Sequence, residues 1–307
     1  MKIYNSILDL IGHTPIVKLN KLPDPNGASV YMKLESFNPG GSVKDRAALN
    51  MIERAEAEEK LIPGKSTIIE PTSGNTGIGI TMVSAVKGYR CIITMPENAT
   101  MERIKIMKAY GAEVILTPAH LRMQGAIDEA IRLAGEIPNS FIPMQFENAA
   151  NADAHRHTTA VEILEAFDGR LDAFVLTAGT GGTVTGTGEE LKKQIPNLKI
   201  YVVEPYGSPV LSGGEPGPHK IPGTGPGFIP KILNREIYDE ILLIKDSDAQ
   251  TMACRLAAAE GIFIGASGAA SAYFALETAK KLPSSARVLC LAPDTGERYL
   301  SSDLFPG

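Results

Sequence analysis

The chain has 307 residues, of which 44% are hydrophobic and 21% are charged, and this composition excludes disordered, collagen-like and disulfide-scaffold proteins. Its 30 Lys and Arg residues against 35 Asp and Glu residues give a formal net charge of −5 at pH 7. Because no stretch of the chain is strongly basic, we expect no nucleic acid and no anionic membrane surface among its partners.

Cysteine usage predicts the compartment. Cys91, Cys254 and Cys290 are odd in number and far apart, which is typical of free thiols in a reducing environment. The first residues contain no apolar segment of the kind found in secretory signals. The chain contains no uninterrupted run of 18 apolar residues, so no membrane-spanning helix is predicted. We therefore expect a cytoplasmic protein.

Short β-rich runs alternate along the chain with longer runs of helical spacing. Strands are predicted at Ser29–Leu34, Thr67–Glu70, Arg90–Met95, Glu113–Thr117, Ala173–Thr177, Lys199–Val203, Glu240–Ile244 and Arg287–Ala292. Helices are predicted at Ser42–Lys60, Ala99–Tyr110, Arg122–Gly135, Ala154–Phe167 and Asp246–Glu260. This alternation indicates an α/β protein with parallel sheets covered by helices on both faces, as either a barrel or two open sheets.

Two turn-rich segments interrupt the alternation, near Pro138–Gln145 and over Tyr206–Gly227. Glycine and proline are too frequent there for a regular element, so we expect hinges or active-site loops. A break near residue 146 leaves two α/β halves of similar length. The predicted domains are therefore residues 1–146 and 147–307.

The segment Asn38–Arg46 reads Asn-Pro-Gly-Gly-Ser-Val-Lys-Asp-Arg and combines a tight turn with the start of a helix. Lys44 then falls in the first helical turn, where the helix dipole disfavours a cation. The same field favours the neutral amine, the form that a nucleophilic lysine must reach from a free pKa of about 10.4. An exposed lysine paired with Asp45 is the competing interpretation.

A second segment, Glu70–Gly77, follows a predicted strand and reads Glu-Pro-Thr-Ser-Gly-Asn-Thr-Gly. Ligands of open α/β sheets bind where strands run into such loops. The hydroxyl groups and the backbone N–H groups of the following helix suit a carboxylate or a phosphate. A capped turn that binds no ligand is the alternative.

A third segment, Ala178–Val184, reads Ala-Gly-Thr-Gly-Gly-Thr-Val and also lies between a predicted strand and a helix. Its backbone N–H groups could cradle a phosphate, although tight packing of the loop would explain the glycines equally well. The dinucleotide fingerprint G-x-G-x-x-G requires glycine where Val184 stands. A nucleotide-binding oxidoreductase is therefore not supported.

Metal and serine-hydrolase chemistry lack sequence support. His155 and His157 are two residues apart, so on a helix they face different sides and do not form a metal-binding pair. The chain has no H-E-x-x-H, no C-x-x-C and no G-x-S-x-G motif. No metal site is predicted.

Taken together, Asn38–Arg46, Thr72–Gly77, Gly179–Thr183 and Ser267-Gly268 resemble the fold-type II pyridoxal-phosphate enzymes, in particular their cysteine synthase/cystathionine β-synthase family. The resemblance runs nearly end to end. It also includes Ile11–Pro15, Met95–Glu97, Gly217–Ile221 and Pro293–Ser301. It implies the tryptophan synthase β-like fold: two open parallel-sheet domains with the cofactor in the cleft between them, and a stretch of about residues 12–35 crossing to the second domain.

The resemblance also implies roles for individual residues. Lys44 would bind pyridoxal 5′-phosphate covalently and act as the catalytic base, Asn75 would hydrogen-bond the ring hydroxyl, and Ser267 would face the ring nitrogen. The family often has G-x-S-S-G at that last position, and Ser267 is the only hydroxyl in Gly265–Gly268. The phosphate would be held by Gly179, Thr180, Gly181, Gly182 and Thr183. The amino-acid carboxylate would be bound by Thr72, Ser73, Gly74, Thr76 and Gln145.

The implied activity is that of the family's O-acetylserine sulfhydrylases, which convert O-acetyl-L-serine and sulfide to L-cysteine and acetate. A cystathionine β-synthase, an O-phosphoserine sulfhydrylase and a non-catalytic regulatory homologue are the alternatives. An O-phosphoserine enzyme is less favoured because residues 217–230 offer His219 and Lys220 but no arginine beside the leaving group. The resemblance further implies a homodimer and allows serine acetyltransferase as a partner.

Overall fold

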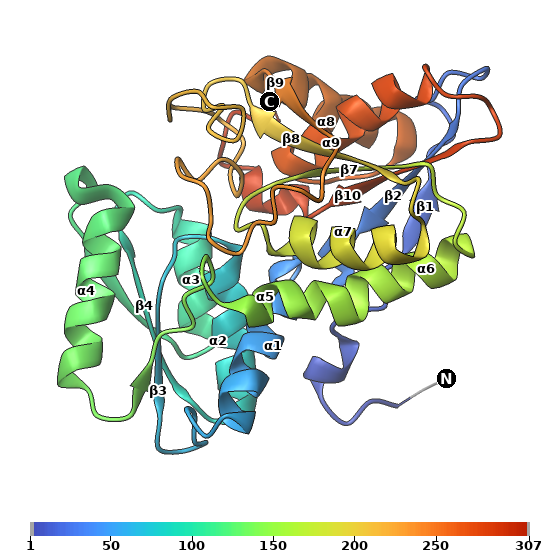
Figure 1. Ribbon diagram of the computed structural model, residues 1–307. Coiled ribbons are helices and arrows are strands. Elements are labelled where there is room, and N and C mark those ends of the chain that lie inside the picture. The colour runs from blue at the N-terminus through green and yellow to red at the C-terminus, as the bar shows by residue number, and fades with distance from the viewer. Residues whose placement is uncertain (1–2, 306–307) are drawn as a thin grey trace. The chain divides into compact units, whose positions relative to one another are not determined.

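The computed structural model describes residues 3–305, which group into two compact units (Figure 1). The first contains residues up to Ile11 together with Lys44–Asn151, and the second contains Gly12–Val43 together with the chain from Ala152 onward. The first unit thus extends to residue 151, five residues past the predicted break. Asn50 Nδ2 donates to the Ala150 carbonyl oxygen at 2.6 Å, which ties this added stretch to the first unit.

The sheet of the first unit is parallel, and its strand order within the described residues is β5 (Glu113–Thr117), β4 (Arg90–Pro96), β3 (Thr67–Pro71) and β6 (Ser140–Phe141). One face packs against α1 (Lys44–Ala57), α2 (Asn75–Lys87) and α3 (Met101–Ala109). The other face packs against α4 (Arg122–Glu136). Side-chain alternation along β3 explains this arrangement, because Ile68 points to the first face and Ile69 to the second.

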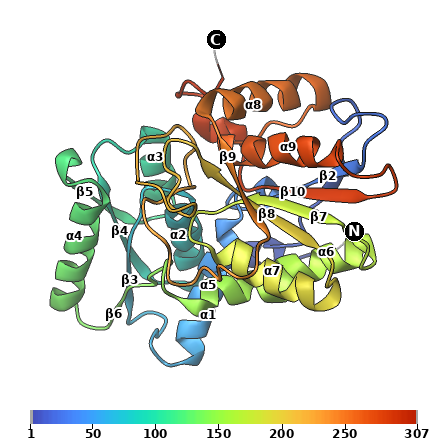
Figure 2. The same cartoon turned by 45° about the horizontal axis from the view of Figure 1, so that its top comes forward.

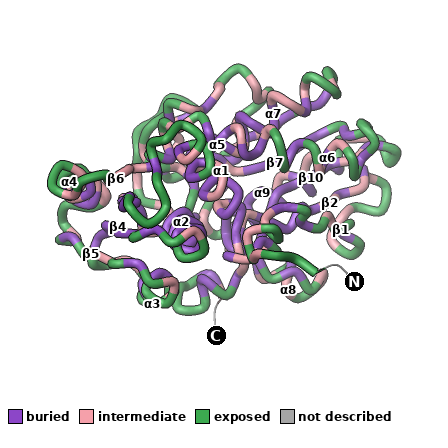
Figure 3. Tube along the Cα trace, turned by 90° about the horizontal axis from the view of Figure 1, so that it is seen from below, coloured by how far each residue is buried: buried purple, intermediate pink, exposed green. Residues whose placement is uncertain are grey.

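The sheet of the second unit has, in the described residues, the strand order β1 (Ile16–Lys18), β2 (Ser29–Leu34), β10 (Arg287–Ala292), β7 (Ala173–Thr177), β8 (Lys199–Pro205) and β9 (Glu240–Ile244). One face is covered by α6 (Ala160–Phe167) and α7 (Gly182–Gln194). The other is covered by α8 (Asp246–Glu260) and α9 (Ala266–Ala279), as Figure 2 shows. The central strands β7 and β10 are almost wholly buried (Figure 3).

The α/β class with parallel sheets in two domains is confirmed. Strand β1 is an exception, because it pairs antiparallel with β2. The helix predicted at Ala154–Phe167 ends at the predicted residue but starts five residues earlier, because α5 (Ala149–Ala154) continues through a π-helical turn at His155–Thr159 into α6. Single 3₁₀ turns lie at Ile7–Leu10, Glu35–Phe37, Ala119–Leu121 and Gly296–Tyr299.

None of the helices in the described part of the chain has the length and apolar character that a bilayer crossing needs.

Gly186 allows a close helix contact in the second unit. A Cβ atom on this residue of α7 would overlap the carbonyl oxygen of Ala152 and lie 3.0 Å from the backbone nitrogen of Arg156. Backbone atoms cannot swing aside as a flexible side chain would, so the helices would have to separate. We expect Gly186→Ala to lower the free energy of unfolding by about 1–3 kcal/mol, measured by chemical denaturation.

Gly135→Ala is the matched control for this prediction. Gly135 also lies in a helix, but no atom comes within 4 Å of its added Cβ. Alanine there should leave stability unchanged or raise it by about 0.5–1 kcal/mol, because it restricts the unfolded chain. Equal stabilities of the two variants would refute the proposed tight contact.

Candidate functional site

The sequence-predicted site residues fall into two groups, one in each unit. The first unit contains Lys44, Thr72, Ser73, Gly74, Asn75, Thr76 and Gln145, and the second contains Gly179, Thr180, Gly181, Gly182, Thr183 and Ser267.

Lys44 is the first residue of α1, in the first helical turn as the spacing predicted. Its side chain is half-buried. Helix α2 packs closely on this first turn. A Cβ added to Gly79 of α2 would lie 3.2 Å from the Lys44 carbonyl oxygen and 3.1 Å from the Ala48 Cβ. The absence of a side chain at Gly79 therefore lets the start of α1 approach α2. At this helix end, the dipole favours a neutral amine over a cation.

The hydroxyl-rich loop connects β3 to α2. Thr72 Oγ1 accepts a hydrogen bond from the Gly74 N–H at 3.2 Å, which closes a tight turn immediately before the helix begins at Asn75. Arg103 of α3 donates from Nη1 to the Ser73 carbonyl oxygen at 3.3 Å. Sequence reasoning missed Arg103, because it lies 30 residues from the loop it contacts.

Thr76 and Gln145 contact each other directly. The Thr76 Oγ1 hydroxyl donates to Gln145 Oε1 at 2.6 Å, and both side chains are buried. Because the amide oxygen accepts this hydrogen bond, the Nε2 group is the end of the Gln145 amide that can act as a donor elsewhere. The backbone N–H groups at the start of α2 add further donors for an anion. The first unit therefore brings polar groups of a kind that could bind an anion together from segments 69 residues apart.

Glu70 is a buried carboxyl group beside this loop. Its side chain is 1% exposed, and Oε2 accepts from the Met144 N–H at 3.2 Å. Burial raises the pKa of the Glu70 carboxyl to about 8, although hydrogen bonds from the backbone of Met144 and Gln145 act in the opposite direction. Sequence reasoning did not identify Glu70 as a site residue, since its partners are more than 70 residues away.

The glycine loop of the second unit runs from β7 into α7. Gly181 has φ +85°, a left-handed conformation that favours glycine, and a Cβ on Gly179 would overlap the Gly223 carbonyl oxygen. Backbone conformation therefore favours glycine at position 181, and packing requires it at position 179. Helix α7 begins at Gly182, so its first three N–H groups have no intrahelical carbonyl partner, and such groups can bind an anion. The Gly182 N–H also donates to Thr180 Oγ1 at 3.4 Å.

His155 supports this loop and was not predicted as a site residue. It is 1% exposed, its Nδ1 lies 2.9 Å from Thr159 Oγ1, and its Nε2 lies 3.2 Å from Thr183 Oγ1. His157 is exposed, so the two histidines lie in different environments, as their spacing predicted. The π-helical turn that carries His155 has no sequence pattern that could have revealed the contact with Thr183.

Ser267 lies in the first turn of α9 and is 4% exposed. A Cβ on the next residue, Gly268, would lie 3.1 Å from the Ala292 Cα at the end of β10, which places this turn beside the carboxyl end of that strand. Strand β10 pairs parallel with β7, so the two strands end at the same sheet edge. Within the second unit, Ser267 and the glycine loop therefore lie at the same sheet edge, beside the carboxyl ends of the neighbouring strands β10 and β7.

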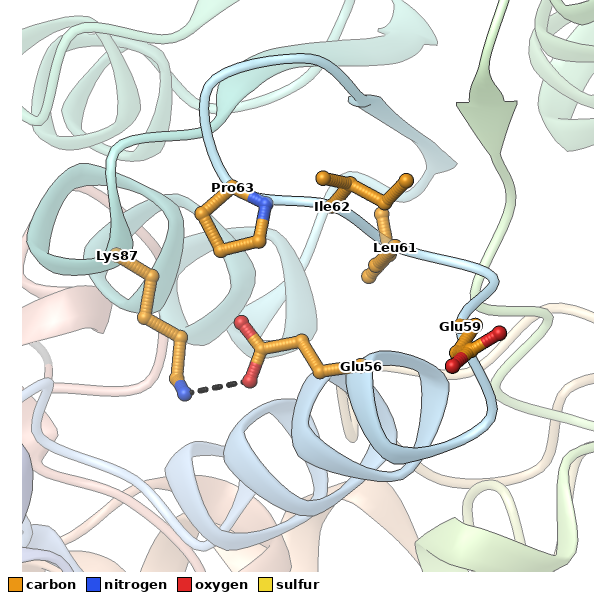
Figure 4. A pocket seen from close by; sticks show the side chains of 6 residues that line it. All are labelled: Glu56, Glu59, Leu61, Ile62, Pro63 and Lys87. Carbon is orange, nitrogen blue, oxygen red and sulfur yellow. Dashed lines mark hydrogen bonds and ion pairs between the residues drawn. The ribbon is translucent and has the colours of Figure 1, made fainter.

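Among the described residues, no cluster of His, Cys, Asp and Glu could hold a metal ion. A surface pocket is lined by Glu56, Glu59, Leu61, Ile62, Pro63 and Lys87 (Figure 4). It lies at the carboxyl ends of α1 and α2, where Lys87 Nζ pairs with Glu56 Oε2 at 2.8 Å. The candidate residues lie at the opposite, amino-terminal ends of these helices.

Comparisons with known proteins give a consistent result. A family model described as pyridoxal-phosphate dependent enzyme matches residues 7–294. A probable cysteine synthase of Bacillus subtilis (strain 168) is 59% identical over 99% of both chains. The crystal structure of an O-ureido-L-serine synthase superposes with a TM-score of 0.96 at 46% identity, covering 100% of this chain and 96% of the other. A cysteine synthase from Entamoeba histolytica superposes with a TM-score of 0.95 at 43% identity, covering 99% and 91%.

The buried Glu70 carboxyl predicts a pH dependence of stability. Its pKa is about 8 in the folded chain against 4.5 as the unperturbed value, so between these pH values the unfolded chain releases this proton and the folded chain retains it. The contribution of Glu70 to the free energy of unfolding is therefore fully present below pH 4.5. It decreases as the pH rises towards 8, by at most about 1.4 kcal/mol per pH unit.

Glu70→Gln removes this titration and serves as the reference. In urea unfolding from pH 5 to pH 8, the stability of the wild type should fall relative to this variant. Cys91 is the titratable neighbour that senses the Glu70 charge, and it stays protonated in this range because burial raises its pKa to about 12. Parallel stability curves for the two proteins would contradict the raised pKa of Glu70.

Proposed function

Because the chain belongs to the family of pyridoxal-phosphate-dependent enzymes, we propose that it catalyses the reaction of O-acetyl-L-serine with sulfide to give L-cysteine and acetate. The observation that carries this proposal is the 59% identity to a probable cysteine synthase over 99% of both chains. The structural likeness to the Entamoeba histolytica cysteine synthase supports the same activity.

The residues fit the cofactor. The start of α7 offers backbone N–H groups for a phosphate, and the glycines that precede it are required by backbone geometry and close packing. We assign Gly179, Thr180, Gly181, Gly182 and Thr183 to the phosphate, Asn75 to the ring hydroxyl and Ser267 to the ring nitrogen. His155 would orient the Thr183 hydroxyl through the contact at 3.2 Å.

Lys44 would hold the cofactor covalently through Nζ and then act on the substrate. When bound, pyridoxal phosphate supplies an electron-withdrawing ring that acidifies the Cα–H bond of an amino acid. The amine of Lys44 would remove the Cα proton as a general base and later return a proton to the same carbon. Its place at the start of α1 supports this role, because the helix dipole favours the neutral amine there.

The first unit would orient the substrate through its carboxylate. We assign Thr72, Ser73, Gly74, Thr76 and Gln145 to this group. Gln145 Nε2 would donate to a carboxylate oxygen, since Oε1 is already engaged by Thr76. The N–H groups at the start of α2 would add further donors, and a substrate fixed in this way presents its Cα–H in one orientation.

Assembly and location are further proposals. We propose a homodimer in the cytoplasm, with serine acetyltransferase as a candidate partner. The cytoplasmic proposal is supported by three free cysteines in the described residues. The dimer and the acetyltransferase complex are supported by the family resemblance alone.

Replacing Lys44 tests the chemistry. Lys44→Ala should lower the turnover of O-acetylserine and sulfide by about 10³-fold or more, because the general base and the covalent anchor are lost together. The visible absorption band of the purified holoenzyme should change as well. Lys65→Ala, at an exposed lysine of the same unit, is the control and should match the wild type. Wild-type turnover in Lys44→Ala would disprove the assignment.

Substrate choice is tested with the unmodified holoenzyme. Addition of O-acetylserine should shift the visible absorption band of the bound cofactor, and subsequent sulfide should restore it with release of L-cysteine. The competing cystathionine β-synthase activity predicts that homocysteine restores the band and sulfide does not. A band that O-acetylserine leaves unchanged would rule out this substrate.

A further inference from the structure

Glu70 connects two segments of the proposed substrate-binding region. It lies at the carboxyl end of β3, and two residues later the chain enters the loop that begins at Thr72. Its buried carboxyl accepts a hydrogen bond from the Met144 N–H, and the backbone of the adjacent Gln145 also favours the ionised carboxylate. One side chain therefore joins the Thr72–Thr76 loop, through the chain itself, to the distant turn that carries Gln145.

This turn has a conformation that needs support from outside. Met144 has φ +58°, in the left-handed region that a non-glycine residue seldom adopts. Such a conformation costs about 1–3 kcal/mol and persists where surrounding contacts fix it. The Glu70 contact to the Met144 N–H, at 3.2 Å, acts directly on this residue.

Asn151 holds the same turn from the other side. Its Nδ2 donates to the Gln145 carbonyl oxygen at 2.8 Å, and the side chain is 1% exposed. The backbone on the two sides of the Gln145 side chain is thus held by Glu70, at the preceding Met144 N–H, and by Asn151, at the Gln145 carbonyl group. Because these contacts come from β3 and α5, the peptide groups around Gln145 cannot rotate without breaking a buried hydrogen bond.

We propose that Glu70 and Asn151 are positioning residues, which hold the Gln145 backbone so that its side chain meets Thr76 and presents Nε2 to the substrate carboxylate. This inference rests on the proposed function of Gln145. Glu70 and Asn151 both contact backbone groups of this turn, so in this proposal each acts through Gln145.

Thermodynamic cost supports a role beyond packing. A buried carboxyl group loses its hydration, and an apolar side chain of similar volume is often more favourable at such a position. The Thr76–Gln145 contact at 2.6 Å shows what the arrangement achieves, since it fixes which end of the amide is left as a donor. Misplacement of Nε2 would weaken substrate binding, because a hydrogen bond to the carboxylate loses strength steeply when its length or angle departs from the optimum.

The experiment compares steady-state kinetics of the holoenzyme variants Glu70→Met and Asn151→Leu with the wild type. Each removes a polar contact to the Gln145 backbone while keeping much of the side-chain volume. We expect each to raise KM for O-acetylserine about tenfold, with kcat and KM for sulfide changed less than about twofold, because one buried hydrogen bond is worth roughly 1.4 kcal/mol. Glu70→Gln keeps an acceptor oxygen and should restore KM.

Glu113→Met is the matched control. It makes the same substitution at an exposed strand residue of the same sheet, so KM should not change. In a Gln145→Ala background, Glu70→Met should add no further rise in KM, since the group it positions is gone. Unchanged KM in both Glu70→Met and Asn151→Leu, or a full additional effect in the Gln145→Ala background, would overturn the proposal. If Glu70→Met does not fold, the Asn151→Leu variant and its own Gln145→Ala combination decide.

A failure of the proposed function would look different. In that case the wild type itself would not turn over O-acetylserine. The positioning proposal would then be decided by titrating the holoenzyme with L-serine and following the cofactor absorption. A dissociation constant about tenfold higher in Glu70→Met and Asn151→Leu than in the wild type would support it. Equal constants, or no L-serine binding by the wild type, would overturn it.

Discussion

Parallel strand pairing is the constraint on which the candidate site depends. Strands β3 and β6 of the first unit run in the same direction, so the segments that leave them start from one sheet edge. The segment after β3 contains Thr76 and the segment after β6 contains Gln145, which is why two residues 69 positions apart form a hydrogen bond. The same rule in the second unit places the glycine loop after β7 and Ser267 beside the end of β10.

Backbone groups provide much of the binding capacity at these edges. Helices α1, α2, α7 and α9 each begin at or near a candidate residue, and the first N–H groups of a helix have no partner within it. Small residues permit this arrangement, as at Gly79, where α2 meets the first turn of α1. The fixed partial positive charge of a helix start suits both an anionic ligand and a neutral lysine.

Much of this architecture could be predicted from the sequence, because it depends on local patterns. Strands β5 and β10 have the predicted bounds, and Lys44 begins a helix as its turn-forming neighbours indicated. Strand β6 escaped prediction, since two residues are too short to show periodicity. The contacts of Glu70 and His155 escaped for another reason. Each joins segments that are distant in the chain, and one sequence without structure contains no record of such pairs.

The division of the chain between the two units has a consequence for the order of folding during synthesis. All residues of the first unit have been made once Asn151 is in place. Strand β2 belongs to the second unit and emerges early, yet its parallel partner β10 starts only at Arg287. On the ribosome, therefore, the first sheet can assemble while β2 still lacks that partner. Strand β2 must stay unaggregated until β10 has been synthesised, and β10 then completes the centre of the second sheet.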